Sequence, residues 1–482
     1  MSVFVHNHTG QSLKSLDFSA FQSLRLLLTS KKDKPLLCKM QEKGLSISYQ
    51  DLLKVSLPMS LGAFVQFFVV FTDNYYAAQL DGKAMSGVSY IGLAYITLAM
   101  ITTGIASSIQ IIVARRMGEQ QWSVIPSIVN NGIFLGIIIA LIQFIALYFF
   151  GPLFIDSFII DADIKNYMLE FSSIRSWGFW IYTPTMLLQA YWTGVAKTKV
   201  VFSTMLITSI SNMILAYMLI FGKGPFSAMG VSGAAWATLS AECLAFVFLY
   251  GYTFLKNPAI IRCLTKPVLT FTRSILQLGT PIVLQLLIAL GVWLAFYTMV
   301  ESRGPQSLQS AFIVRNMYML AWVSVMGFSS AMRTYSSALI AENRIHDLKK
   351  LFFRIASFNF IGVLILSHGL WIYPEWISTQ FTQDATTIRY TVDTMKLIVP
   401  AMLIYSFTSI LLAWVEGSGA TVAGFWIEVI TSCIYIISIY IMVHFTEWEV
   451  SLLWLSDYVY FIVMGICSGL YLIYGNWRLN KL

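Results

Sequence analysis

The sequence predicts an all-α membrane protein with twelve transmembrane helices, arranged as two pseudo-symmetric six-helix lobes around a central cavity. Three observations predict this fold class. First, the chain is 57% hydrophobic and only 11% charged, which is too little charge to cover a water-facing surface. Second, twelve apolar runs are each long enough to cross a bilayer. Third, the second half of the chain repeats features of the first half at one constant spacing.

The twelve apolar runs follow one another along the chain, and each can cross about 30 Å of hydrocarbon as a helix. Unbroken runs of this length indicate membrane helices, so we predict one helix for each. Six lie in the first half: Val55–Leu80, Val88–Ala114, Ile125–Phe150, Tyr167–Gln189, Val200–Phe221 and Gly230–Leu255. Six lie in the second half: Ile275–Val300, Leu308–Leu339, Leu351–Tyr373, Tyr390–Trp414, Val422–Phe445 and Leu452–Tyr474.

The loops between these runs divide the basic residues unevenly. Of the 31 lysines and arginines, 22 lie before the first run, after the last run or in the loops that follow even-numbered runs. Only 5 lie in the loops that follow odd-numbered runs. Cytoplasmic loops of membrane proteins carry the excess of positive charge. We therefore expect a multi-pass protein of the cell (inner) membrane with both termini in the cytoplasm.

An internal repeat relates the two halves at one constant spacing, here called the repeat offset, which brings Pro58 onto Pro281. The persistence of one register through about five helices is stronger evidence than any single identity. Each half has an even number of spans, so both enter the membrane the same way round, related by an axis along the membrane normal. The other matched pairs are Tyr95/Tyr318, Gly104/Gly327, Ser107/Ser330, Glu119/Glu342, Tyr182/Tyr405, Ala190/Ala413, Gly194/Gly417 and Thr198/Thr421.

Four segments are expected from this organisation. Residues 1–50 form a cytoplasmic amphipathic segment, although a tail without structure or a translation start at Met40 would explain the same residues. Residues 51–255 form the N-terminal lobe, residues 256–274 a basic cytoplasmic linker, and residues 275–482 the C-terminal lobe. Two lobes joined by a linker are typical of a transporter that rocks between two access states.

Signatures of soluble enzymes are missing from the sequence. It contains no HExxH, GxSxG, Walker A or GxGxxG string, and its five cysteines include no CxxC pair. We expect no enzyme activity, no metal centre, no cofactor and no nucleic-acid partner. A membrane-embedded enzyme would require a nucleophile and a base that the sequence does not reveal.

Several motifs, in order along the chain, resemble those of the multidrug and toxic compound extrusion (MATE) family. The first span and its loop read LPMSLGAFVQFFVVFTDNYYAAQLDGKAMSGVS from Leu57, and the second span ends TGIASSIQIIVARRMGEQ from Thr103. TGVAKTK from Thr193, SNMILAYMLIFG from Ser211 and GVSGAAWAT from Gly230 follow. The resemblance covers about Tyr49 to Trp477. The wider superfamily includes lipid-precursor and polysaccharide flippases, which share the fold.

Asp73 is the principal candidate for cation coupling. A carboxylate within a membrane helix costs about 2.5 kcal/mol or more and is usually functional. The alternative is an Asp near the helix end that reaches water. The resemblance to the family implies that Asp73 is a coupling residue and that Asn212 and Thr238 supply neutral oxygens, although both could instead hydrogen-bond between helices.

The coupling ion is expected to be a proton rather than sodium. The second carboxylates found in branches of the family are replaced here by Ala216, Ala289 and Tyr405, and a nearly lone carboxylate suits a proton better than sodium, although Na⁺ at Asp73 remains an alternative. Glu242 and Glu428 are further acids within spans, for which pairing inside a lobe is slightly favoured over ion relay. Glu416 and Asp457 lie near helix ends and are expected to be wet.

Basic and aromatic residues within the spans are candidates to line a substrate cavity. Arginines could contact an anionic substrate or pair with acids, and flat rings suit amphiphilic molecules through stacking and cation–π contacts. Arg333 is expected deeper in the membrane than Arg315, and either could pair with Asp73. The cavity candidates are Arg175, Tyr182, Trp293, Tyr297, Arg315, Tyr318, Trp322 and Tyr405.

Taken with the resemblance, these residues predict a monomeric secondary transporter that exports amphiphilic small molecules by cation antiport. Its only other partner is expected to be the lipid bilayer. The alternative is a flippase for lipid-linked or anionic precursors, which the arginines within the spans favour.

Overall fold

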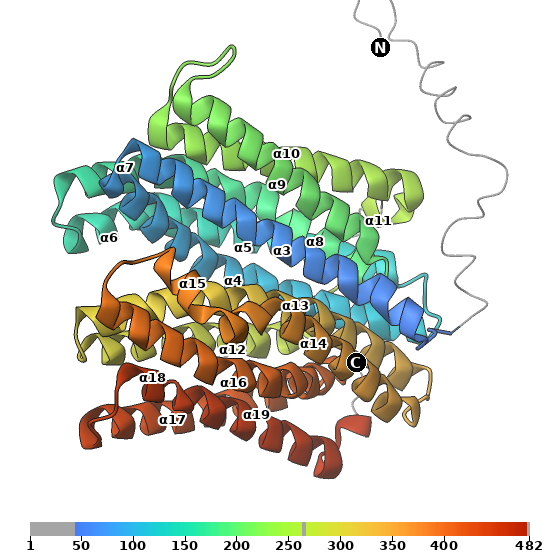
Figure 1. Ribbon diagram of the computed structural model, residues 1–482. Coiled ribbons are helices and arrows are strands. Elements are labelled where there is room, and N and C mark those ends of the chain that lie inside the picture. Colours follow the sequence, from blue (N-terminus) through green and yellow to red (C-terminus); the bar gives the residue numbers. More distant parts are fainter. Residues whose placement is uncertain (1–43, 263–266, 480–482) are drawn as a thin grey trace, which may run out of the picture. The chain divides into compact units, whose positions relative to one another are not determined.

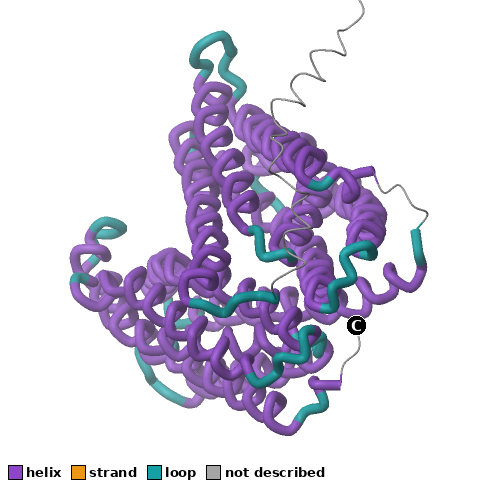
Figure 2. Tube along the Cα trace, turned by 90° about the vertical axis from the view of Figure 1, so that its right-hand side faces the viewer, coloured by secondary structure: helices purple, strands orange, loops and turns teal. Residues whose placement is uncertain are grey.

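The computed structural model describes residues 44–262 and 267–479. Within them all regular structure is helical, and short loops join the helices (Figure 2). Most of the predicted N-terminal segment, residues 1–50, lies outside the described residues, as do residues 263–266 of the predicted linker.

Helices of the first and second halves of the chain occupy separate parts of Figure 1. The first half contains α3 (Tyr49–Leu80), α4 (Gly82–Gly118), α5 (Ile125–Ile145), a π-helical turn (Ala146–Phe150), α6 (Gly151–Phe158), α7 (Ala162–Arg175), a 3₁₀ turn (Ser176–Gly178), α8 (Phe179–Gly194), α9 (Thr198–Phe221), α10 (Gly230–Lys256) and α11 (Pro258–Arg262). The second contains α12 (Leu269–Glu301), α13 (Pro305–Ala341), α14 (Asp347–Ile372), α15 (Pro374–Thr379), α16 (Ala385–Gly417), α17 (Thr421–Phe445), α18 (Val450–Leu453), α19 (Leu455–Tyr474) and a 3₁₀ turn (Trp477–Leu479).

The predicted all-α membrane fold is confirmed. Eleven helices of the described residues are long and apolar enough to span a membrane. The predicted fourth helix, Tyr167–Gln189, is not a single helix, because the 3₁₀ turn Ser176–Gly178 divides it into α7 and α8. Together α7 and α8 provide the twelfth path across the membrane.

The internal repeat extends to the helix boundaries. The repeat offset that brings Pro58 onto Pro281 also brings both ends of α4 (Gly82–Gly118) onto the ends of α13 (Pro305–Ala341). Helix caps repeat as well, because Asp161 caps α7 by accepting from Ile164 N at 3.1 Å, and Asp384 caps α16 by accepting from Thr387 N at 2.8 Å. An aspartate at this position satisfies backbone N–H groups that have no partner within the helix.

Close contacts between the halves follow the same pseudo-symmetry. Gly104 of α4 packs so closely on Val283 of α12 that a Cβ would lie 2.8 Å from the Val283 backbone nitrogen. In the repeat-related contact, Gly327 of α13 packs on Ser60 of α3, where a Cβ would lie 2.5 Å from the Ser60 nitrogen. The repeat offset converts one pair into the other. Thus α3 with α13, α4 with α12, and α4 with α13 form the main contacts between the lobes.

One end of the molecule, here called the linker end, carries residues 44–48, helix α11, residues 267–268 and the loops 119–124, 195–197, 342–346 and 418–420. Many hydrogen bonds join the lobes there. Gln110 Nε2 donates to the carbonyl of Ser330 at 2.9 Å and to Thr334 Oγ1 at 2.9 Å, and Ser337 Oγ donates to the Ile111 carbonyl at 2.9 Å.

Hydrophobic packing also links the lobes at the linker end. One buried cluster combines residues of α3, such as Leu52 and Val55, with residues of α13, such as Met332 and Leu339. Nearer the opposite end, a cluster around Phe296 belongs to the C-terminal lobe and a cluster around Ala216 to the N-terminal lobe. The lobes therefore share a core at the linker end and keep separate cores towards the other end.

Candidate functional site

Asp73 lies on α3, about two turns before the helix ends at Leu80 and away from the linker end. Its Oδ1 atom is buried and has no hydrogen-bond partner. Asn212 of α9 and Thr238 of α10 face its carboxylate. The structure thus brings the three predicted cation-coupling residues together.

Hydrogen bonding around Asn212 leaves a second oxygen without a partner. Asn212 is fully buried, and its Nδ2 donates to Thr238 Oγ1 at 2.9 Å. Thr238 Oγ1 in turn donates to the Ala234 carbonyl at 3.0 Å, so its hydroxyl acts as the acceptor for Asn212. Asn212 Oδ1 is left buried without a partner. An unsatisfied buried acceptor costs about 1–3 kcal/mol, and this cluster contains two of them, Asp73 Oδ1 and Asn212 Oδ1.

Arg175 forms an ion pair with Glu242 on the neighbouring α10. Its Nη1 and Nη2 donate to the two carboxylate oxygens at 2.9 Å and 2.7 Å, and its guanidinium lies 3.7 Å from the centre of the Tyr95 ring. Gly178 makes room for this arrangement, because a Cβ there would overlap Arg175 Nη1. Arg175 was predicted to line a substrate cavity, but its guanidinium is already bound to Glu242 within the N-terminal lobe.

The charges of this region do not balance. Asp73 interacts electrostatically with both Arg175 and Glu242, so one guanidinium serves two carboxylates. Because Glu242 takes both arms of Arg175, the unpaired negative charge falls on Asp73. Tyr182, another predicted cavity residue, lies beside this cluster with its ring 6.0 Å from that of Tyr95.

The repeat-related positions of the C-terminal lobe are aromatic. The repeat offset relates Asp73, Asn212 and Thr238 to Phe296, Tyr435 and Phe461, which lie in one hydrophobic cluster. The rings of Phe296 and Tyr435 are 6.4 Å apart. The fold is therefore pseudo-symmetric, whereas the arrangement of Asp73 with its two polar neighbours is particular to the N-terminal lobe.

Predicted cavity residues of the C-terminal lobe gather in two adjoining groups. In the first, the Arg315 guanidinium lies 6.0 Å from the Trp293 ring and 5.6 Å from the Tyr297 ring. Trp293 also contacts Tyr318, with ring centres 5.5 Å apart. None of the described carboxylates forms an ion pair with Arg315.

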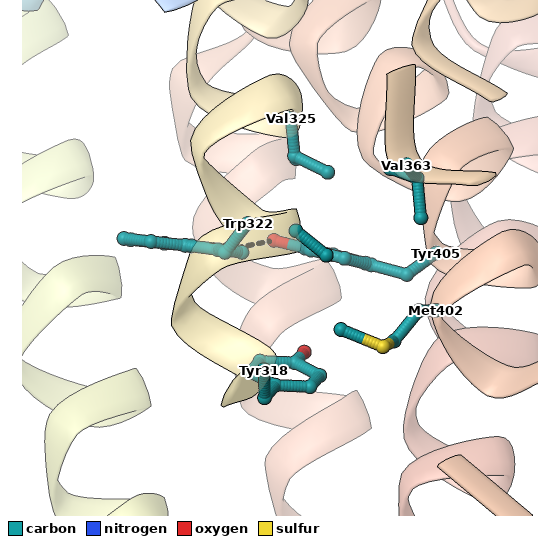
Figure 3. A pocket seen from close by; sticks show the side chains of 7 residues that line it. Tyr318, Trp322, Val325, Val363, Met402 and Tyr405 are labelled. Carbon is teal, nitrogen blue, oxygen red and sulfur yellow. Dashed lines mark hydrogen bonds between the residues drawn. The ribbon is translucent and has the colours of Figure 1, made fainter. Parts of the chain in front are cut away.

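The second group surrounds a small hollow within the C-terminal lobe (Figure 3). Trp322 Nε1 donates a hydrogen bond to Tyr405 Oη at 3.1 Å, and the ring of Tyr318 lies below this pair in the view. The full lining is Tyr318, Ala321, Trp322, Val325, Val363, Met402 and Tyr405.

Two acids predicted to be wet are buried, so those predictions were wrong. Glu416 is 4% exposed and accepts an ion pair from Arg333 Nη1 at 2.9 Å. Asp457 is 8% exposed and faces Tyr435. Both lie near helix ends, but neighbouring helices cover them. Arg333 is bound to Glu416 near the linker end, whereas Asp73 lies towards the other end, so the suggested Arg333–Asp73 pair does not form.

Sequence reasoning missed the partners in these contacts. Arg175 and Glu242 are 67 residues apart, and Arg333 and Glu416 are 83 apart; in each case the two lie on different helices. The available signal was the presence of both basic and acidic residues within the predicted spans of each half. Among the described residues, no three His, Cys, Asp or Glu side chains converge as metal ligands.

Comparison with known proteins agrees with this architecture. The chain matches the MatE family at residues 58–218 and again at residues 281–441. A curated relative, the probable multidrug resistance protein NorM of Bacillus cereus, is 21% identical over 445 residues, covering 88% of this chain and 94% of the relative. The Thermotoga maritima protein of the same name is 21% identical over 441 residues, covering 89% and 93%.

Solved structures share the fold. An outward-facing MATE transporter of the MOP superfamily superposes with a TM-score of 0.83 at 17% identity, covering 92% of this chain and 98% of that chain. A MOP superfamily transporter from Pyrococcus furiosus with a binding pocket of reversed polarity gives a TM-score of 0.83 at 16% identity, covering 93% and 98%. The two family matches cover more than half of the chain and begin at the repeat-related residues Pro58 and Pro281, one in each half. The chain belongs to the MatE family, the multidrug and toxic compound extrusion (MATE) transporters.

Proposed function

We propose that this protein exports amphiphilic organic molecules in exchange for inward-moving protons, and that Asp73 binds the coupling proton. Membership of the MatE family makes the chain a membrane transporter and not an enzyme. The relatives named NorM are described as probable multidrug resistance proteins, which supports drugs and similar small molecules as substrates. We propose that the protein works as a monomer.

The observation that carries the proposal is the pair of buried oxygens without partners, Asp73 Oδ1 and Asn212 Oδ1. Two acceptors cannot bond to each other. If Asp73 binds a proton, its O–H can donate to Asn212, and one proton satisfies both atoms. Binding would also remove the negative charge that Arg175 leaves uncompensated. The free energy otherwise lost to unsatisfied acceptors, about 1–3 kcal/mol each, would favour this protonated state.

Sodium fits the same site less well. A hard cation needs several oxygen ligands to replace its water. The oxygens next to Asp73 are those of Asn212 and Thr238, and the Thr238 hydroxyl already bonds to Asn212 and to the Ala234 carbonyl. The remaining donor set is too small, which favours a proton.

Alternating access is supported by a difference between the two ends of the molecule, since the lobes are in close contact at one end and packed separately towards the other. Hydrogen bonds and a shared core hold them together at the linker end, whereas their cores are separate towards the other end. The basic loops lie at the linker end, so we propose that this end and both termini are cytoplasmic, in a cell inner membrane. The structure then corresponds to a state closed to the cytoplasm, and rocking of residues 51–255 against 275–482 about the linker would open it.

A second candidate function, a flippase for anionic lipid-linked precursors, is favoured by Arg315. Its guanidinium lies over aromatic rings and makes no ion pair with a described carboxylate. A phosphate group could therefore bind there without displacing an internal partner.

Dye efflux from proteoliposomes tests the proposed function directly. The protein is reconstituted with a cationic fluorescent dye inside, and a pH gradient or a sodium gradient is imposed separately. We expect efflux driven by the pH gradient alone. Efflux driven only by sodium would overturn the proton assignment, and flipping of a labelled anionic lipid without dye efflux would establish the second candidate instead.

A further inference from the structure

The C-terminal lobe contains a second group of buried acids around Glu428 of α17. Glu428 is 2% exposed, and its Oε1 accepts hydrogen bonds from Tyr460 Oη and from Ser432 Oγ, the latter at 3.3 Å. Two hydroxyl donors reach this carboxylate, and no described cation forms an ion pair with it. It is therefore a buried acid without a counter-charge of its own.

The charged residues near Glu428 show the same imbalance as those near Asp73, namely two carboxylates and one guanidinium. Arg333 of α13 is bound to Glu416 of α16, and Glu416 interacts electrostatically with Glu428. Two carboxylates again share one guanidinium. Glu416 holds the guanidinium, so the uncompensated charge falls on Glu428. The groups that face Glu428 are Tyr460 from α19, Glu416 and Tyr405 from α16, and Arg333 behind Glu416.

An unsatisfied amide oxygen of α12 lies beside this group, near Gly424 of α17. Gln285 is 8% exposed, and its Oε1 is buried without a hydrogen-bond partner. A Cβ at Gly424 would lie 3.6 Å from Gln285 Oε1 and 3.4 Å from Glu416 Cγ, so both side chains meet the same patch of α17. Side chains of a helix lean towards its N-terminus, and Glu428, one turn after Gly424, leans over that patch.

We propose that Glu428 is a second proton-binding carboxylate, located in the C-terminal lobe and separate from Asp73. When protonated, Glu428 keeps Tyr460 and Ser432 on Oε1 and donates its own O–H from Oε2 to Gln285 Oε1. The proton thus neutralises the uncompensated charge and supplies the donor that Gln285 lacks. Asp73 with Asn212 and Glu428 with Gln285 use the same chemistry, an acid facing an unsatisfied amide oxygen, at positions that the repeat does not relate.

The site adjoins the hollow of Figure 3. Tyr405, whose hydroxyl accepts from Trp322 in that view, interacts electrostatically with Glu428 and Glu416. Glu428 lies about two turns after the start of α17 at Thr421, hence about 10 Å from the linker end of that helix, whereas Asp73 lies towards the opposite end. The two proton sites are therefore in different lobes and in different halves of the membrane.

Infrared spectroscopy of the purified full chain tests the proposal without any transport assay. The C=O stretch of protonated carboxylic acids is recorded while the pH is stepped from acid to alkaline in choline chloride. We expect the pH-dependent band of the wild type to include one component from Glu428 and one from Asp73, beside those of other acids such as the buried Asp457. Glu428→Gln should remove one and Asp73→Asn the other, while Glu447→Gln, an exposed acid of the same lobe, should remove neither. An unchanged band in Glu428→Gln would overturn the proposal.

Two further variants keep the test decisive if Glu428→Gln fails to fold. Gln285→Leu removes the proposed acceptor and should move the Glu428 component to higher frequency, and Tyr460→Phe should shift it as well. Constant frequencies in both variants would contradict the site. If sodium chloride instead of choline chloride abolishes the component, the ligand is sodium and the proton assignment is wrong. Failure of this test leaves the export proposal intact, because that proposal depends on Asp73 and is measured by flux.

Discussion

Arg175 and Glu242 form a two-armed ion pair across the N-terminal lobe, with N–O distances of 2.9 Å and 2.7 Å. Their side chains are only 10% and 12% exposed. The pair influences the electrostatics of the candidate site, because Asp73 and Glu242 share one guanidinium and Glu242 takes both of its hydrogen-bonding arms. The same relation recurs in the other lobe between Arg333 and Glu416, with Glu428 as the acid left over.

Breaking this pair should destabilise the protein more than removing it altogether. Arg175→Met or Glu242→Leu alone leaves one buried charge without its partner, which costs about 3–5 kcal/mol. The double variant leaves neither charge and should recover most of that loss. Unfolding free energies in detergent, measured as a double-mutant cycle, check this. A double variant as unstable as the sum of the two single variants would show that the pair is not a unit.

Gln110 should hold the lobes closed at the linker end. Its Nε2 bonds to Ser330 and Thr334 of the other lobe, and each hydrogen bond contributes about 1 kcal/mol net. Gln110→Leu should therefore raise alkylation of a buried Ser337→Cys reporter about fivefold or more, in a background without native cysteines. Gln143→Leu is the matched control, because Gln143 is another buried glutamine of the same lobe and, among the described residues, bonds only within that lobe. Equal labelling in the two variants would refute a role for Gln110 in closure.

Gly327 should tolerate no side chain. A Cβ would overlap Ser60 Oγ and lie 2.5 Å from the Ser60 nitrogen, so α3 and α13 would have to move apart. Gly327→Ala should lower the melting temperature markedly and destabilise the closed interface. Gly291→Ala is the control, because no atom lies within 4 Å of its added methyl group; we expect a gain of about 0.5–1 kcal/mol there. Similar melting temperatures for the two variants would contradict the proposed interface.

Arg315 should distinguish an exporter of cations from a carrier of anions. Arg333 is already bound to Glu416, so only Arg315 is changed. Arg315→Gln should leave efflux of a cationic dye intact. It should reduce transport of an anionic amphiphile by about tenfold or more, because a hydrogen bond to a charged group contributes about 1.5–3 kcal/mol. Arg389→Gln, at an exposed ion pair with Glu449, serves as the control. Equal loss of both substrates would assign Arg315 a structural role.

Much of the fold could be predicted because membrane helices require long apolar runs, which are visible in a single sequence. The repeat offset that relates Pro58 to Pro281 also relates the bounds of α4 and α13. The break at Ser176–Gly178 could not be predicted from hydropathy, which does not report how helices pack against one another. Gly178 has no side chain, and the Arg175 guanidinium fills the space that a Cβ would occupy. The ion-pair partner of Arg175, Glu242, lies on another helix.

The candidate site was predictable only in part. Asp73, Asn212 and Thr238 could be named from their types and from the family resemblance, and the structure places them together. The ion pair of Arg333 with Glu416 and the burial of Asp457 could not be predicted, because both depend on how the helices pack against one another. Helix ends are poor guides to exposure when neighbouring helices extend beyond them, as Glu416 shows.

Proton flux through Asp73→Asn in proteoliposomes tests the central claim most directly. Asparagine keeps the shape of the side chain and cannot exchange a proton. We expect substrate-evoked proton flux, followed with an internal pH indicator, to vanish in Asp73→Asn while the variant remains folded and inserted. Asp393→Asn, an exposed acid on α16, should retain the wild-type flux. Undiminished substrate-evoked flux in Asp73→Asn would contradict the assignment of Asp73 as the coupling residue.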